Sequence, residues 1–305
     1  MIHSKLANME KNQIVILDDR GLIAVEGLEA EDFLQNMISN DIKKVSESNS
    51  IFSGIFTPQG KYLYEFFILK NKTGYLLDCD VNFKDELIEH LQKFKLRSKI
   101  DIKDLSSSHV IGAINRDKFN EIQEEVKSNK QTIIYRESPC FLDSRLDLLG
   151  ARILSTLEKL HLTIKKLNLK IIDKSNYLKL AHNHGVPIEG LKNLQNNLFG
   201  LECNLEEING IDFKKGCYIG QENTARMRLK NKLRRRLMPI STNSQLNISD
   251  EITFDNQVVG KVLIDGKYPF ALFKLFDPNF NEFSNANLKA GQADIKILIP
   301  SQLNI

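Results

Sequence analysis

The amino-acid sequence predicts an α+β fold, with small sheets and single helices in its first two thirds and strands alone at its end. In the first part, strand-sized apolar runs alternate with helices of amphipathic spacing. From Leu237 onward only strand-sized runs remain, and turn residues separate them. The length of 305 residues allows two or three domains with sizeable cores.

Two short strands and a helix are predicted first. Residues 13–17 and 22–25 are strand-like, and the turn 18–21 separates them. After Gly27, apolar residues recur at helical spacing, and the acidic residues at the start of this run suit the helix dipole. We expect this helix to end near residues 39–41.

Three further runs, separated by turn residues, are typical of an antiparallel meander. A helix follows, with Asn82 as its predicted N-cap. Together with the elements behind it, the meander predicts a ferredoxin-like insert over about residues 51–135. The predicted elements are strands 51–56, 61–69 and 75–80, helix 83–95, strands 99–103 and 110–114, helix 118–126 and strand 132–135.

One more clear helix precedes the strand-only module. Residues 176–182 are helical, and Gly185 suits the position after a helix end. His182 and His184 are two residues apart, so they do not share a helical face and a metal pair is not expected. Lysine-rich residues 159–170 are predicted to be a solvated face or a mobile connection without an assigned function. A small β-barrel or sandwich over residues 234–305 is predicted from strands at 251–254, 258–264, 269–275 and 295–299.

The composition argues against several functional classes. The net charge is only +3, so nucleic-acid binding would need a local basic patch. No apolar run approaches the length of a membrane span, and no signal-peptide core follows the first residues. The four cysteines are widely spaced and form no C-x-x-C pair. We therefore expect a cytoplasmic protein with reduced thiols, no membrane contact and no tightly bound metal or cluster.

One stretch concentrates chemically reactive residue types, and its sequence is Lys215-Gly216-Cys217-Tyr218-Ile219-Gly220-Gln221-Glu222, followed by Thr224-Ala225-Arg226. The glycines let a ligand approach the main chain closely. The cations Lys215 and Arg226 favour a thiolate at Cys217 if they point at it. Gln221 and Glu222 offer an amide and a carboxylate for hydrogen bonds. The alternative is a turn with a buried structural cysteine, since free cysteines are among the most buried residues.

This stretch resembles the signature of the YgfZ family, folate-binding proteins that assist the assembly and repair of iron–sulfur clusters. The family is related to the glycine-cleavage T-protein, a tetrahydrofolate-dependent aminomethyltransferase. Residues 33–41, with Phe-Leu-Gln and Ser-Asn-Asp, and the turn Pro58-Gln59-Gly60 carry the same resemblance. It implies a T-protein-like folate-binding region over residues 1–233, interrupted by the ferredoxin-like insert, and a C-terminal β-barrel over residues 234–305.

The resemblance also implies roles for single residues. In the T-protein, a Glu at the place of Glu202 binds the pterin, and two carboxylate oxygens can accept parallel N–H bonds from its 2-amino-pyrimidinone edge. The alternative is that Glu202 is a surface acid, the usual fate of Glu. The expected cofactor-binding residues are Glu202, Asn204, Gly216, Tyr218, Gly220 and Arg152. The expected reactive residues are Cys217, Lys215, Gln221, Glu222 and Arg226.

Two positions depart from the pattern of these relatives. Tyr64-Glu65 stands where the T-protein carries an Asp pair that includes its catalytic aspartate, which argues against aminomethyl transfer. We expect Glu65 to be a solvent-facing strand residue. Ala181 stands where many family members carry an arginine, which argues against an anionic ligand at that helix.

Basic residues alternate with other residues behind the signature. A period of two predicts a strand or hairpin with one cationic face. That face could hold the glutamate tail of a folate or the phosphates of RNA, and the alternative is a solvated strand face. The residues concerned are Arg226, Arg228, Lys230, Lys232 and Arg234.

From the resemblance we expect a monomeric, tetrahydrofolate-binding accessory protein for iron–sulfur enzymes, with Cys217 as its reactive group. The implied cofactor is tetrahydrofolate or a one-carbon derivative, and the implied partners are iron–sulfur client or assembly proteins. The first alternative is a folate-dependent aminomethyl or one-carbon transferase. The second is a factor that binds tRNA for its modification, although the basic residues lack interleaved aromatic residues for stacking.

Overall fold

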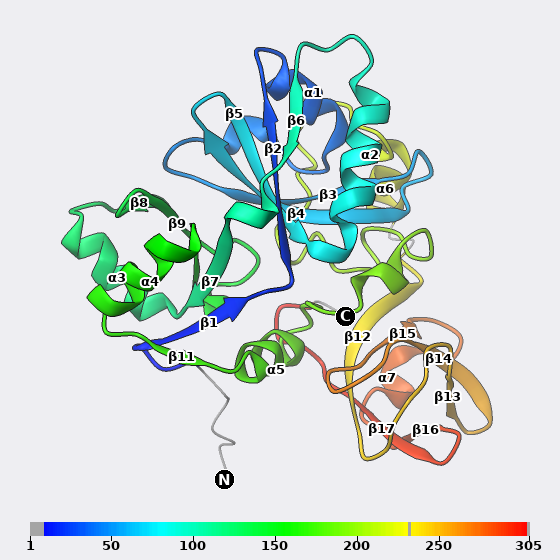
Figure 1. The fold of residues 1–305 in the computed structure, drawn as a ribbon. Coiled ribbons are helices and arrows are strands. Elements are labelled where there is room, and N and C mark those ends of the chain that lie inside the picture. Colours follow the sequence, from blue (N-terminus) through cyan, green and yellow to red (C-terminus); the bar gives the residue numbers. More distant parts are fainter. Residues whose placement is uncertain (1–8, 231–232, 304–305) are drawn as a thin grey trace. The chain divides into compact units, whose positions relative to one another are not determined.

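The computed structural model describes residues 9–230 and 233–303, and these form two compact units (Figure 1). The first unit comprises the chain up to Ile55, Tyr64–Tyr177 and Ile208–Ile219. The second comprises Phe56–Leu63, Leu178–Glu207 and the chain from Gly220 onward. The division into residues 1–233 and 234–305 that the sequence suggests stays a prediction.

A five-stranded sheet contains the predicted meander, with the strand order β3-β4-β5-β2-β6. Its β2 pairs antiparallel with β5, so that Ile23 lies opposite Leu77, and the β5 residues are all buried. Two helices, α1 and α2, belong to the same region, and their buried residues recur at helical spacing. The bounds are β2 Arg20–Glu26, α1 Ala30–Met37, β3 Ile51–Phe56, β4 Tyr62–Asn71, β5 Gly74–Asp80, α2 Lys84–Lys95 and β6 Asp101–Asp104.

The N-cap predicted for α2 is wrong. Phe83 occupies the N-cap position and makes no side-chain cap hydrogen bond. Asn82 lies inside a short 3-10 turn, Val81–Phe83, and its main-chain amide donates to Asp80 at 2.7 Å. The acidic side chain one position before the turn therefore caps the 3-10 turn, and the α-helix continues directly from it.

A six-stranded sheet completes the first unit, with the order β11-β1-β7-β10-β9-β8. The strand nearest the N-terminus, β1, lies inside this sheet, parallel to β11 and antiparallel to β7. The lysine-rich segment is no unstructured connection: it forms α4, whose Leu160 and Thr163 are buried, and then β11. The bounds are β1 Gln13–Leu17, β7 Val110–Ile114, α3 Arg116–Glu125, β8 Thr132–Tyr135, β9 Ser138–Leu142, β10 Ala151–Ser155, α4 Leu157–Lys166 and β11 Lys170–Ile172.

The second unit contains a closed barrel of six strands, which confirms a barrel in preference to a sandwich. Its interior is apolar and includes Met238, Val262 and Phe273. The helix α5, Ser175–Asn183, precedes this unit's loops, as the sequence predicts. The remaining bounds are α6 Gln221–Leu229, β12 Arg235–Thr242, β13 Glu251–Phe254, β14 Gln257–Ile264, β15 Phe270–Lys274, α7 Phe280–Phe283, β16 Leu288–Ala290 and β17 Ala293–Ile297.

The basic segment behind the signature is a helix, so the predicted strand is wrong up to Leu229. Only Thr224 of α6 is buried, and its residues form no apolar face that could impose a helical period on the sequence. The basic residues Arg226, Arg228 and Lys230 occupy every second position, which is the period expected of a strand. Lys232 lies outside the described residues, and Arg234 directly precedes β12.

Within the described parts of the chain, no helix is long and apolar enough to span a membrane.

Candidate functional site

A buried lysine anchors the signature loop in the first unit. The ammonium Nζ of Lys215 donates to the main-chain oxygens of Gln35, Ile38 and Asn40, at 2.7, 2.6 and 3.1 Å. These oxygens lie at and just beyond the C-terminal end of α1, where carbonyls have no helical partner. Burial lowers the pKa of Lys215 to about 8, whereas the three carbonyls favour its charged form. The lysine therefore ties the loop to α1 and directs its charge away from the solvent.

Polar residues of the Phe-Leu-Gln…Ser-Asn-Asp segment complete this anchor. The side chain of Asn40 donates to the carbonyls of Phe52 and Asn209, at 2.8 and 2.9 Å. The hydroxyl of Ser39 donates to the carbonyl of Gly210 at 2.6 Å. Two sequence segments that carry the family resemblance thus form one hydrogen-bonded structure in the first unit.

Cys217 lies at the open part of this loop. It is exposed, and a Cβ placed at the neighbouring Gly216 would meet no atom within 4 Å. On either side the chain is held, by Lys215 and by the buried Tyr218, whose ring lies 4.8 Å from the lysine Nζ. The main-chain amide of Ile219 donates to Asn36 at 3.2 Å. The loop thus presents one thiol from a short segment that is fixed at both ends.

The three other cysteines are buried in the described structure. They are Cys79, Cys140 and Cys203. Burial raises the pKa of the Cys79 thiol to about 12 and raises that of Cys140 as well. Because the thiolate is the nucleophile and the metal ligand, these two thiols are chemically inert near neutral pH. The alternative of a buried structural cysteine therefore fits Cys79 and Cys140, and it does not fit Cys217.

A hollow of about 420 Å³ lies beside the signature loop in the first unit. Ile219 lines it together with α1 residues, among them Phe33 and Asn36, and with Phe94 of α2. Acidic Glu29 and Asp32 also line it. The hollow therefore offers apolar contact next to the loop that carries the exposed thiol.

The second half of the signature belongs to the second unit and packs against the Pro58-Gln59-Gly60 turn. Gly220 has φ +87°, and a Cβ there would lie 2.5 Å from the carbonyl oxygen of Thr57. The side chain of Asn223 donates to the carbonyl of Gln59 at 2.8 Å. Only glycine fits this position, because both the backbone angle and the close approach exclude a side chain.

The other predicted reactive residues lie on α6, in the second unit. Glu222 and Arg226 form an exposed ion pair at 2.9 Å, and Gln221 is half-buried. Since Cys217 belongs to the first unit, its predicted proximity to Arg226 stays a prediction. Lys215 contacts carbonyls, as described, so its ammonium charge is already engaged.

Glu202 and Asn204, the predicted pterin contacts, are buried in the second unit. One carboxylate oxygen of Glu202 accepts from Arg235 Nε at 2.9 Å, and the other accepts from the Phe199 amide at 2.9 Å and from Arg235 Nη2 at 3.2 Å. Asn204 donates to the carbonyl of Leu237 at 2.9 Å. A pterin edge at Glu202 would have to displace Arg235, whose side chain is partly exposed. The pterin role of Glu202 stays a prediction.

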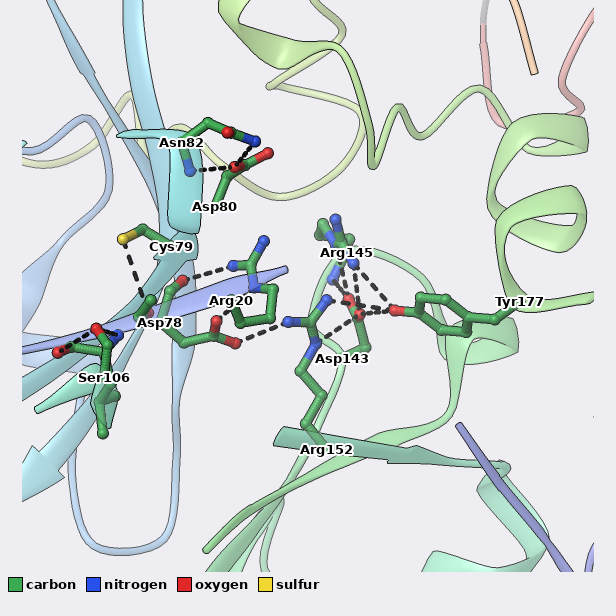
Figure 2. A network of polar contacts seen from close by, with 12 residues as sticks. Arg20, Asp78, Cys79, Asp80, Asn82, Ser106, Asp143, Arg145, Arg152 and Tyr177 are labelled. Carbon is green, nitrogen blue, oxygen red and sulfur yellow. Dashed lines mark hydrogen bonds and ion pairs between the residues drawn. The ribbon is translucent and has the colours of Figure 1, made fainter. Parts of the chain in front are cut away.

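Arg152, the remaining predicted cofactor contact, lies in a buried charge network of the first unit (Figure 2). Its Nη1 lies 2.7 Å from Asp78, and its Nε lies 3.4 Å from Asp143. The guanidinium also lies over the ring of Phe67, 4.3 Å from its centroid. Asp143 pairs with Arg145 at 2.8 Å as well. The arginine is thus satisfied by protein groups, and its predicted contact with a cofactor stays a prediction.

Sequence reasoning missed most of this network. Arg20 pairs with Asp78 at 2.6 Å, and the hydroxyl of Tyr177 lies 3.3 Å from Arg152. Burial opposes the charged form of Asp143, but the neighbouring arginines hold its pKa below the ordinary value. The available signal was two acids, Asp78 and Asp80, in a strand whose other residues are not charged. Glu65 is a further correction: it is buried in β4 and does not face the solvent.

The chain is similar in sequence to iron–sulfur cluster assembly factors. It is 32% identical over 237 residues to the "Iron-sulfur cluster assembly factor IBA57 homolog, mitochondrial" of Mycosarcoma maydis, which covers 73% of this chain and 55% of the relative. The protein of the same name from Dictyostelium discoideum is 27% identical over 270 residues, covering 79% of this chain and 65% of the relative. The chain thus spans about half to two thirds of the length of these relatives. No protein-family model matches it.

These relatives overturn one expectation. They are named as mitochondrial proteins, which contradicts the cytoplasmic location expected from the sequence. Widely spaced cysteines indicate a reducing compartment and do not distinguish the cytoplasm from the inside of an organelle.

Among solved structures, the chain is similar to the glycine cleavage system aminomethyltransferase T from Bartonella henselae. The TM-score is 0.73 and the sequence identity 12%, with 98% of this chain and 88% of the other covered. At this identity the likeness concerns the fold alone. It confirms the predicted T-protein-like α+β fold with a C-terminal β-barrel.

Proposed function

We propose that this protein is an accessory factor in the assembly of iron–sulfur clusters, that it acts in mitochondria, and that Cys217 is its reactive group. The similarity to assembly factors named as mitochondrial supports the process and the location. The observation that carries the role of Cys217 is its exposure on an anchored loop, while the other three cysteines are buried.

A single exposed thiol provides too few ligands to hold an iron–sulfur cluster alone. Iron–sulfur clusters are usually held by four cysteine thiolates. Among the described residues, no group of three or more His, Cys, Asp or Glu side chains could hold a metal ion. In this proposal Cys217 therefore supplies one sulfur ligand, and the client or assembly protein supplies the others. The cluster is cargo that passes between proteins.

Lys215 acts in this proposal as a positioning residue. Its three hydrogen bonds to carbonyls fix the loop immediately before the thiol. A thiol on an anchored loop loses little conformational freedom when a partner's cluster binds it. The adjoining hollow, lined by Phe33 and Ile219, offers apolar contact to the same partner.

The test is complementation of cells that lack their own assembly factor. Cys217→Ser is expected to abolish the activity of dependent iron–sulfur enzymes while the variant accumulates to the wild-type level. Cys203→Ser, a change at a buried cysteine, serves as the matched control and is expected to retain activity per folded molecule. Full activity of Cys217→Ser at equal protein level would refute the role of the thiol.

A further inference from the structure

A second cavity, of about 1050 Å³, lies in the first unit, and no residue of the signature loop lines it. Its walls come from the β4–β5 hairpin, the β8–β9 hairpin and the junction of β10 with α4. Apolar side chains form much of these walls, among them Leu69, Leu76, Pro139 and Leu154. The cavity can therefore accept a ligand with an apolar body.

Three buried residues with hydroxyls line the cavity, on two faces of the sheet. Ser138 and Ser155 share the face of Cys140 and Ile153, and Thr132 lies on the opposite face. The Oγ atoms of Ser138 and Ser155 lie 2.7 Å apart, and both residues are almost fully buried. One hydrogen bond uses only part of what two hydroxyls can donate and accept. Thr132 is 5% exposed, and its Oγ1 has no hydrogen-bond partner among the described residues. A buried hydroxyl without a partner is costly, so a ligand atom that reached Thr132 Oγ1 would supply a hydrogen bond that the described residues do not.

The charges around the cavity favour an anion. Four lysines and two glutamates line it, and these six side chains carry a formal net charge of +2. The N-terminal end of α4 adds the positive end of a helix dipole, because its N-cap Thr156 lines the cavity. Lys159, in the first turn of α4, pairs with the exposed Glu137 at 2.6 Å, and a ligand anion would compete for this lysine.

We propose that this cavity binds a small organic anion with an apolar body. The anionic group lies at Ser138, Ser155 and Lys159, the apolar body lies against the leucines, and Thr132 bonds a polar atom of the ligand. A nucleoside phosphate and a medium-chain fatty acid both have this chemistry. The site is independent of the cluster-related function proposed for Cys217.

The test uses 8-anilino-1-naphthalenesulfonate, an aromatic anion whose fluorescence rises in apolar surroundings, with the full chain. Binding is expected to saturate at one site. Lys159→Met is expected to weaken it about tenfold, as for the loss of a charged partner. Lys165→Met, on the same helix and outside the lining, is the matched control and is expected to bind as the wild type.

A second pair of variants tests the hydroxyl. Thr132→Val is expected to weaken probe binding several-fold without lowering the melting temperature, because the hydroxyl has no protein partner to lose. Thr163→Val removes another buried, unpartnered hydroxyl that does not line the cavity, and it is expected to leave binding unchanged. The proposal is refuted if binding does not saturate, or if Lys159→Met and Thr132→Val both bind the probe as the wild type does.

Competition identifies the source of the anion. Displacement of the probe by AMP, with no displacement by adenosine, would assign a phosphate ligand. Displacement by decanoate would assign a fatty acid.

Discussion

Arg152 and Asp78 form an ion pair at 2.7 Å that joins β10 of the six-stranded sheet to β5 of the five-stranded sheet. Both side chains are buried. Ion pairs connect Asp78 and Asp143 with Arg20, Arg145 and Arg152 (Figure 2). Within these ion pairs three arginines share two aspartates, and the buried Asp80 also interacts electrostatically with Arg20. The two paired aspartates are therefore the scarcer partners. Removing an aspartate therefore leaves buried cations without compensation, which is costly in a medium of low polarity.

The first prediction compares the two sides of this ion pair. Asp78→Asn is expected to lower the free energy of unfolding by about 3–5 kcal/mol. Arg20 and Arg152 both lose the Asp78 carboxylate, and Arg152 keeps only its longer carboxylate contact, with Asp143. Arg152→Met leaves each aspartate with one arginine, so we expect a smaller loss. Urea denaturation measures both, with the exposed Asp147→Asn as control. An equal or larger loss for Arg152→Met would contradict the argument from charge balance.

The second prediction concerns the two glycines of the signature. Gly220→Ala is expected to lower the free energy of unfolding by at least about 1–3 kcal/mol, because φ is +87° and the new Cβ would lie 2.5 Å from the Thr57 oxygen. Gly216→Ala is expected to change it by less than about 0.5 kcal/mol, since its Cβ would meet no atom within 4 Å. Thermal and urea unfolding of the two variants give this comparison. Equal losses of unfolding free energy in the two variants would mean that the Pro58-Gln59-Gly60 turn moves and makes room for the new Cβ at residue 220.

The third prediction ranks the thiols by reactivity. Iodoacetamide at neutral pH is expected to modify Cys217 first and Cys79 and Cys140 only after unfolding, since burial raises the pKa of both buried thiols. Mass spectrometry of the native protein at several times measures the order. Lys215→Met tests whether the lysine fixes the loop, because it removes the three hydrogen bonds to carbonyls. The backbone amides of residues 213–219 are then expected to exchange with deuterium faster than in the wild type. Earlier labelling of Cys140 than of Cys217 would show that the exposed loop is not the reactive one.

The fourth prediction tests tetrahydrofolate at Glu202. If the pterin displaces Arg235, Arg235→Met should bind tetrahydrofolate more tightly, because the carboxylate is freed from its competitor. Glu202→Gln should bind it more weakly by about 2 kcal/mol, as for the loss of a charged hydrogen-bond partner. Isothermal titration calorimetry with the full chain measures both. If both variants bind tetrahydrofolate with wild-type affinity, Glu202 does not contact the pterin.

The elements that the sequence predicted best are those with a strong period or clear turn residues. The strands Ile51–Phe56 and Val110–Ile114 coincide with their predicted ranges, since apolar residues predominate in both. Helix α6 could not be recognised in this way, because it has no apolar face and only its Thr224 is buried. The ion pair of Arg152 with Asp78 could not be predicted from the sequence either. Asp78 lies 74 residues away in the sequence, and the pairing depends on how two sheets pack against each other.

Among the predicted site residues, the exposure of Cys217 agrees with its predicted role, whereas the contacts of Lys215 differ from the predicted ones. The motif indicated a special thiol, and the structure gives Cys217 the exposure that this needs. The same motif suggested that Lys215 acts on the thiol, but its ammonium is held by the carbonyls of Gln35, Ile38 and Asn40. Sequence patterns record which residue types occur together, whereas the direction of a long side chain depends on unpaired groups elsewhere in the fold.

The position of β1 between β11 and β7 has a consequence for how the chain folds during synthesis. The strand nearest the N-terminus finds its antiparallel partner only at Val110–Ile114 and its parallel partner only at Lys170–Ile172. Contacts of such high sequence separation form slowly, because a long loop must close before any pairing compensates its lost entropy. In a nascent chain, both edges of the strand Gln13–Leu17 are therefore unpaired until residues 110–114 have been made, and one edge stays unpaired until residues 170–172 follow. During that interval the strand is a natural substrate for chaperones that bind extended apolar segments.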